Sequence, residues 1–85
     1  MSPTTDLIAA TWDANADLVR GLLNGGASVN ERDAGGRTAL SYAAEAGMLN
    51  ITSMLIDGGA DANLADNNGR SPVFWWAQGT MVQPI

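Results

Sequence analysis

The chain has 85 residues, enough for one small domain, and a folded domain of this size hides only about 60 % of the surface that its unfolded chain exposes. It has no cysteine and no histidine, so disulfides, zinc fingers and catalysis by cysteine or histidine side chains are excluded. Nine acidic residues against four arginines give a net charge of −5, and such a surface is expected to repel nucleic acid.

The chain shows no sign of a membrane segment. Its longest apolar run, residues 73–77, is far shorter than the roughly 20 residues of a membrane span, and no targeting signal is evident. We therefore expect a cytoplasmic chain whose partner is neither a membrane nor nucleic acid.

The sequence repeats itself at an offset of 33 residues. Between residues 20–37 and 53–70, eight of eighteen pairs are identical without a gap. The repeated residues are Leu22, Gly25, Gly26, Ala27, Asn30, Asp33, Gly36 and Arg37. The chain therefore holds about two and a half units. These are repeat 1 over about residues 5–35, repeat 2 over about 36–68 and a partial repeat over about 69–85.

Each unit is predicted to contain two short helices. Because the sequence repeats at an offset of 33 residues, the first unit is expected to have the same arrangement as the second. In the second unit, Thr38 can cap a helix over residues 39–46, and Gly47 suits the left-handed backbone that ends a helix. The next helix is expected over about residues 49–57, before a glycine pair stops it. Its apolar side chains share one face: Met48, Ile51, Met54 and Leu55.

The segment between units, residues 60–70, is rich in glycine, asparagine and aspartate, which favours an extended, hairpin-like turn. Because a helix pair cannot bury its apolar face alone, successive units must stack. The alanine pairs at residues 9–10 and 43–44 are expected where the first helices of neighbouring units pass close together.

These features resemble the ankyrin repeat. The resemblance rests on the 33-residue period, on residues 36–47, and on two Gly-Ala-x-x-Asn-x-x-Asp elements at residues 26–33 and 59–66. It implies one ankyrin-repeat domain over residues 1–85, of the all-α class: an α-solenoid of stacked helix-turn-helix repeats with hairpin-like turns. It also implies a non-enzymatic module whose concave face and turn tips bind a protein partner.

The residues themselves give no sign of catalysis. There is no Gly-x-Ser-x-Gly elbow, no phosphate-binding glycine loop and no cluster of metal-ligand residues. We therefore predict no enzymatic activity, no cofactor and no metal.

Several positions depart from the family's pattern. Ser41 stands where the family usually has a histidine, which is expected to cost some local rigidity, and Ala14 replaces the glycine that ends the first helix of a unit. In the third unit, Trp76 falls on the position of Ala43, and Pro84 falls inside the second helix. The apolar end, with Val73, Phe74 and Trp76, is expected either to cap the stack or to seek another surface, and we favour the cap.

The family's recognition surface, carried over position by position, predicts contacts with a protein partner at Trp12, Asp13, Arg37, Tyr42, Glu45, Asn67, Asn68, Arg70, Trp75 and Gln78. Arg37 and Arg70 are expected to grip carboxylates of the partner, or else to pair with Asp33 and Asp66. Trp12 is either an interface anchor or part of an N-terminal cap.

Two pairs of residues one repeat apart carry further expectations. Tyr42 and Trp75, one repeat apart, predict an aromatic ridge beside the arginines, although packing between adjacent first helices would also explain them. The repeated asparagines, Asn30 and Asn63, are expected to hydrogen-bond within their own turns.

The alternatives to partner binding are self-association through the C-terminal aromatic end, as a dimer or with an exchanged helix, and a small acidic mimic that binds a basic groove.

Overall fold

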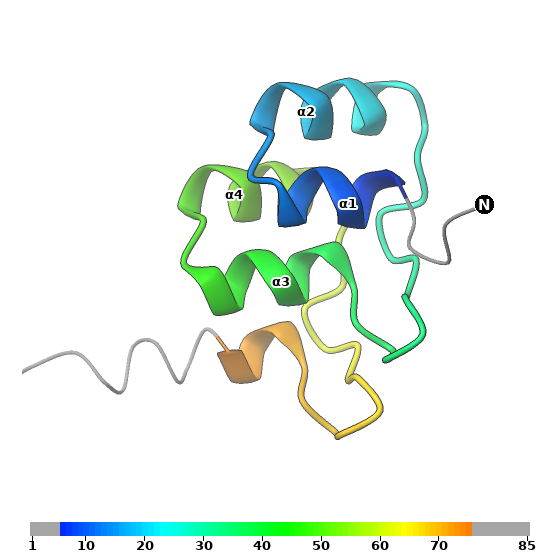
Figure 1. Cartoon of the computed structure of the whole chain (residues 1–85), viewed down its shortest axis with the longest axis vertical. Coiled ribbons are helices and arrows are strands. Elements are labelled where there is room, and N and C mark those ends of the chain that lie inside the picture. Colours follow the sequence, from blue (N-terminus) through cyan, green and yellow to red (C-terminus); the bar gives the residue numbers. More distant parts are fainter. Residues whose placement is uncertain (1–5, 76–85) are drawn as a thin grey trace, which may run out of the picture.

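The structure, a computed structural model, describes residues 6–75 and consists of stacked helix pairs (Figure 1). The helices are α1 (Asp6–Trp12), α2 (Ala16–Asn24), α3 (Ala39–Ala46) and α4 (Leu49–Asp57). Residues 72–75 form a further helical turn next to α3, and residues 6–75 contain no strand. The first helices α1 and α3 pack against each other, as do the second helices α2 and α4. The predicted all-α stack is confirmed.

The bounds of α3 and α4 agree with the prediction, and local signals set those of α3. The Thr38 Oγ1 atom accepts a hydrogen bond from the Ser41 amide at 3.2 Å, so the first turn of α3 is capped. Gly47 ends α3 in the left-handed region at φ 71°. At the end of α1 the same backbone is adopted by Ala14, at φ 56°, a conformation that is costly for a residue with a Cβ.

The core lies between the two helix layers. Its buried side chains are Leu7, Ile8, Ala10, Val19, Ala39, Leu40, Ala43, Ile51 and Leu55. The apolar face predicted for α4 is confirmed, because Ile51 and Leu55 are buried and Met48 and Met54 pack against the core. The expectation for the alanine pairs is wrong at Ala9, which is exposed. Its position corresponds to that of Tyr42, which is only partly buried.

An aspartate organises each long turn. The Asp33 Oδ1 atom accepts hydrogen bonds from the amides of Gly35 and Arg37, both at 2.9 Å. Asp66 repeats this arrangement, with the amides of Asn68 at 2.8 Å and Arg70 at 2.9 Å. Each turn closes in a hairpin-like way, since the amide of its aspartate donates to the carbonyl of its arginine.

Successive turns are joined by asparagines. The Asn67 amide donates to the Gly35 carbonyl at 2.9 Å, and its side chain donates to the Ala34 carbonyl at 3.1 Å. The expectation for Asn30 is wrong: its side chain bonds the next turn, with Oδ1 accepting from the Asp61 amide at 2.7 Å. These side chains therefore fix the spacing of the repeats as well as the shape of a turn.

Candidate functional site

A row of aromatic and arginine side chains crosses the three repeats on the side of the first helices. The Trp12 and Tyr42 rings meet edge to face, with centroids 5.4 Å apart. The Arg37 Cζ atom lies 4.0 Å from the Tyr42 ring centroid and 5.1 Å from that of Trp75. The Arg70 Cζ atom lies 5.0 Å from the centroid of the Trp75 ring. We call Trp12, Tyr42, Arg37, Trp75 and Arg70 the aromatic–arginine row.

The repeat explains how the row is positioned. Arg37 and Arg70 end equivalent turns, and Tyr42 and Trp75 follow five residues later on the helical segments. The predicted ridge of Tyr42 and Trp75 is thus interleaved with the arginines, since Arg37 is within cation–π distance of both rings.

Arg37 is held on several sides. Its Nε donates to Ser41 Oγ at 3.1 Å, and its Nη2 donates to the Ser41 carbonyl at 3.2 Å. The same Nη2 forms an ion pair with Glu45 Oε1 at 2.6 Å. The alternative pairing of Arg37 with Asp33 is therefore wrong, because the side chain turns along α3 toward Glu45. Ser41, at the family's histidine position, acts as a buried acceptor.

The Asp33 carboxylate also orients Tyr42, whose hydroxyl donates to Asp33 Oδ2. Burial tends to raise the pKa of Asp33, but the hydrogen bonds from Tyr42, Arg37 and Gly35 together lower it. The pKa of Tyr42 is raised to about 12, most strongly by burial and next by the hydrogen bond to Asp33. Asp33 is therefore ionised and Tyr42 neutral at physiological pH.

Arg70 is held more loosely than Arg37. Its Nε lies 4.0 Å from Asp66 Oδ2, so the alternative pairing with Asp66 is confirmed at the limit of an ion pair. The Arg70 side chain is 40 % exposed and that of Arg37 is 18 % exposed. The backbone amide of Arg70 lowers the pKa of Asp66, against the opposing effect of burial. Among residues 6–75, Arg70 thus has fewer side-chain partners than Arg37, and its side chain is the more exposed.

The other predicted contact residues are spread around the row. Trp12 is 69 % exposed, while Asp13, Glu45, Asn67 and Asn68 are also exposed. Val73 and Phe74 are exposed beside the last turn, where the Phe74 and Trp75 rings meet edge to face at 5.3 Å. Trp76 and Gln78 lie outside the described residues, as does the segment against which Trp12 was alternatively expected to pack.

Prediction from sequence named Asp33 and Asp66 only as alternative partners of the arginines, and it missed Ser41 as a member of the site. The identity of Asp33 and Asp66 one repeat apart was the available signal.

Within residues 6–75, no group of three or more histidine, cysteine, aspartate or glutamate side chains is placed to hold a metal ion. Nor is any helix in that range long and apolar enough to cross a bilayer.

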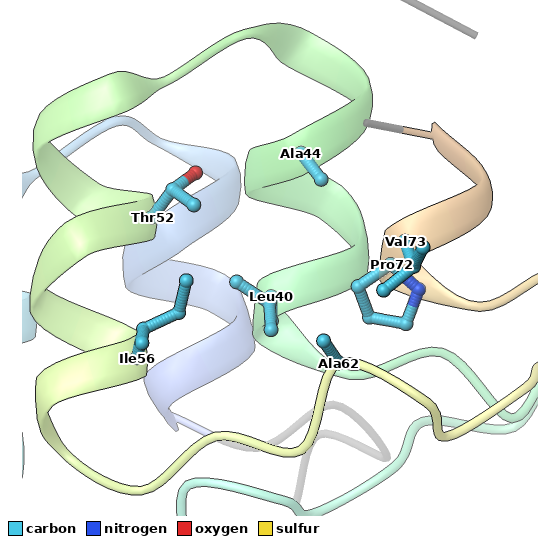
Figure 2. Close-up of a pocket in the computed structure, with 7 residues that line it drawn as sticks. All are labelled: Leu40, Ala44, Thr52, Ile56, Ala62, Pro72 and Val73. Carbon is cyan, nitrogen blue, oxygen red and sulfur yellow. The ribbon is translucent and has the colours of Figure 1, made fainter. Parts of the chain in front are cut away.

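Two hollows in the surface are lined in part by residues of α3. One, of about 370 Å³, is lined by Trp12, Tyr42, Glu45, Ala46 and Met48. The other, of about 170 Å³, lies between α3, α4 and the last helical turn. Figure 2 shows its lining side chains converging: Leu40, Ala44, Thr52, Ile56, Ala62, Pro72 and Val73.

Comparisons with known proteins agree with this geometry. A family model described as ankyrin repeats (3 copies) matches residues 7–82. Among solved structures, the ankyrin-repeat domain of Bcl-3, described as a unique member of the IkappaB protein family, is similar with a TM-score of 0.85 and 31 % sequence identity. That match covers 87 % of this chain but only 32 % of the Bcl-3 chain. No curated protein sequence matches. With a 33-residue period, stacked helix pairs joined by aspartate-closed turns, and a family match over most of its length, the chain belongs to the ankyrin-repeat family.

Proposed function

We propose that the chain binds a protein partner through the aromatic–arginine row. The observation that carries this proposal is the continuity of the row, since side chains from three successive repeats contact one another on one side of the stack. Ankyrin repeats are in general protein-interaction modules and serve as non-enzymatic scaffolds. The row supplies a surface of that kind for this chain.

The two ends of the row are suited to contact and its middle to support. Arg37 is fixed by Ser41 and Glu45, so the surface is ordered before a partner arrives and little side-chain entropy is lost on binding. Trp12 and Arg70 are the more exposed members, and tryptophan and arginine are common among the residues that dominate interface energies. We expect Trp12 to anchor the partner and Arg70 to meet a carboxylate or carbonyl group.

The proposal is tested by affinity capture with the full chain and three variants. Trp12→Ala and Arg70→Ala each change an exposed end of the row, and Leu49→Ala removes an exposed apolar side chain from α4, on the other helix layer. We expect bound proteins to be lost, or their affinity reduced about tenfold or more, only in the row variants. Equal capture by all four proteins would reject the row as the binding surface.

A second candidate function is self-association through the C-terminal end. Val73 is 46 % exposed beside the apolar hollow of Figure 2. On the wall of this hollow, the Thr52 hydroxyl is buried without a hydrogen-bond partner in residues 6–75. A second copy that covered the hollow would bury apolar surface.

Light scattering over a concentration series tests this candidate. Self-association predicts a mass that rises above the 8.8 kDa monomer with concentration, and Val73→Ser is expected to reverse the rise. A monomer at every concentration would reject it.

The acidic-mimic hypothesis remains a prediction from the net charge of −5 and requires binding that weakens steeply with salt.

A further inference from the structure

The hollow between the end of α1 and the C-terminal half of α3 is lined by aromatic, acidic and apolar side chains. It measures about 370 Å³ and is bounded by two aromatic rings, Trp12 and Tyr42, by the Glu45 side chain, and by the apolar side chains of Ala46 and Met48. The two rings are nearly perpendicular, at 89°, and so form a corner rather than a parallel slot. Glu45 is the only charged residue in this lining.

The charges around the hollow favour a cation. Asp33 and Glu45 contribute two negative charges and Arg37 one positive charge, which leaves a net charge of −1 around Tyr42. Asp13 adds an exposed carboxylate next to Trp12 in the sequence. The whole chain carries −5, so an approaching basic group is also attracted at longer range.

Glu45 retains the capacity to bind a second cation. Its Oε1 accepts from Arg37 at 2.6 Å, while Oε2 has no partner within the part of the chain that the structure describes. A carboxylate has room for about four hydrogen bonds, so one ion pair does not saturate it. The Glu45 side chain is 44 % exposed, which leaves it reachable from solvent.

The aromatic corner favours an ammonium group. Ring faces attract cations, tryptophan most strongly, and Trp12 is largely uncovered. The Arg37 guanidinium already lies against the Tyr42 ring, so a second planar guanidinium would find that ring partly occupied. A compact ammonium can sit in the corner, while its aliphatic stem packs on the Met48 thioether side chain.

From this geometry we infer that the hollow binds the ammonium group of a lysine side chain on the protein partner. Trp12 and Tyr42 provide the aromatic walls and Glu45 Oε2 accepts a hydrogen bond from the ammonium. The inference rests on the proposed function and names the chemistry of the partner at one end of the aromatic–arginine row.

The test uses the full chain and three capped peptides that differ only at the central residue: Gly-Gly-Lys-Gly-Gly, the same peptide with norleucine, and the same peptide with arginine. Binding is followed by NMR on the indole resonance of Trp12, which is assigned by its loss in Trp12→Phe. We expect the lysine peptide to shift this resonance saturably. The norleucine peptide should bind about tenfold more weakly, because it keeps the stem but lacks the charge.

Variants then separate the walls from the carboxylate. Glu45→Gln is expected to weaken lysine-peptide binding about fivefold and to reduce its salt dependence. Trp12→Ala should abolish binding, followed through the amide resonances of α3, and Leu49→Ala should leave it unchanged. Equal binding of the lysine and norleucine peptides, equal binding of the arginine peptide, or no shift of Trp12 would each overturn the inference.

The outcomes distinguish this inference from the proposed function. Should the peptides fail while Trp12→Ala and Arg70→Ala still lose the captured partner, the row binds a partner by other chemistry and the lysine assignment is wrong. Should the row variants capture the same proteins as the original chain, the proposed function fails, whatever the peptides do.

Discussion

Arg37 and Arg70 occupy equivalent positions in successive repeats and differ in what surrounds them. Both end an aspartate-closed turn, and both approach the Trp75 ring. Arg37, however, has the Ser41 hydroxyl and the Glu45 carboxylate as partners, whereas the residue equivalent to Ser41 is Phe74, which offers no acceptor on its side chain. The repeated backbone therefore places both arginines, and Ser41 and Glu45, four and eight residues after Arg37, hold the first of them.

The same contrast holds for the turn aspartates. Asp33 accepts a hydrogen bond from the Tyr42 hydroxyl. Asp66 has Trp75 at the equivalent position, and the Trp75 indole nitrogen is buried without a hydrogen-bond partner in residues 6–75. Asp66 is thus left to pair loosely with Arg70. Within residues 6–75, the second repeat therefore has more side-chain hydrogen bonds, and the arginine of the third repeat is the more exposed.

The largest expected effect comes from removing the locked arginine. Arg37→Ala deletes an ion pair with Glu45 and two hydrogen bonds to Ser41, so we expect the free energy of unfolding to fall by about 2 kcal/mol. Arg70→Ala removes a 40 % exposed side chain with a 4.0 Å pair and a contact to the Trp75 ring, and it should cost about 1 kcal/mol or less. Urea unfolding of both variants measures the difference, and equal losses would contradict the comparison.

An alkaline titration tests the hydrogen bond between Tyr42 and Asp33. The chain has a single tyrosine and no cysteine or lysine, so Tyr42 is the one side chain that titrates between pH 9 and the arginine range. Its pKa is raised to about 12 in the folded state, compared with about 10 in an unfolded chain.

Because the folded pKa is the higher one, the neutral hydroxyl stabilises the fold fully below pH 10 or so, and this stabilisation is lost as pH rises toward 12. We expect the free energy of unfolding to fall across that interval and to stay flat in Tyr42→Phe. A tyrosine absorbance titration with a midpoint near 10 in the folded protein would contradict the assignment.

Ser41 provides a finer test of how Arg37 is held. Ser41→Ala keeps the backbone acceptor of Arg37 and removes only the Oγ acceptor at 3.1 Å, so we expect a loss of about 1 kcal/mol in unfolding free energy. Ser53→Ala, an exposed substitution on α4, serves as control and should change stability by about 0.5 kcal/mol or less. If Ser41→Ala matches the control, the hydroxyl does not contribute to holding Arg37.

The sequence allowed prediction of those features that depend on local signals. The bounds of α3 and α4, the Thr38 cap and the Gly47 stop follow from residues within one turn of each helix end. The contacts that were predicted wrongly or missed join residues that local patterns do not relate. Asn30 bonds the turn that lies one repeat later, and Arg37 selects Glu45 rather than Asp33 because both the turn and α3 set its direction.

Equivalent helix ends in the first and second repeats differ in one residue, alanine in the first and glycine in the second. Ala14 and Gly47 both have positive φ, and both follow a first helix whose last carbonyls accept their backbone amides and those of the next residue. A Cβ at Gly47 would meet open space, so side-chain packing does not distinguish the two positions and only backbone strain does. Ala14→Gly is therefore expected to raise the free energy of unfolding by about 0.5–1 kcal/mol, and Gly47→Ala to lower it by about 1 kcal/mol. Opposite signs in urea unfolding would confirm that Ala14 is a strained helix end, whereas a loss in Ala14→Gly would mean that the greater freedom of glycine in the unfolded chain outweighs the strain relieved.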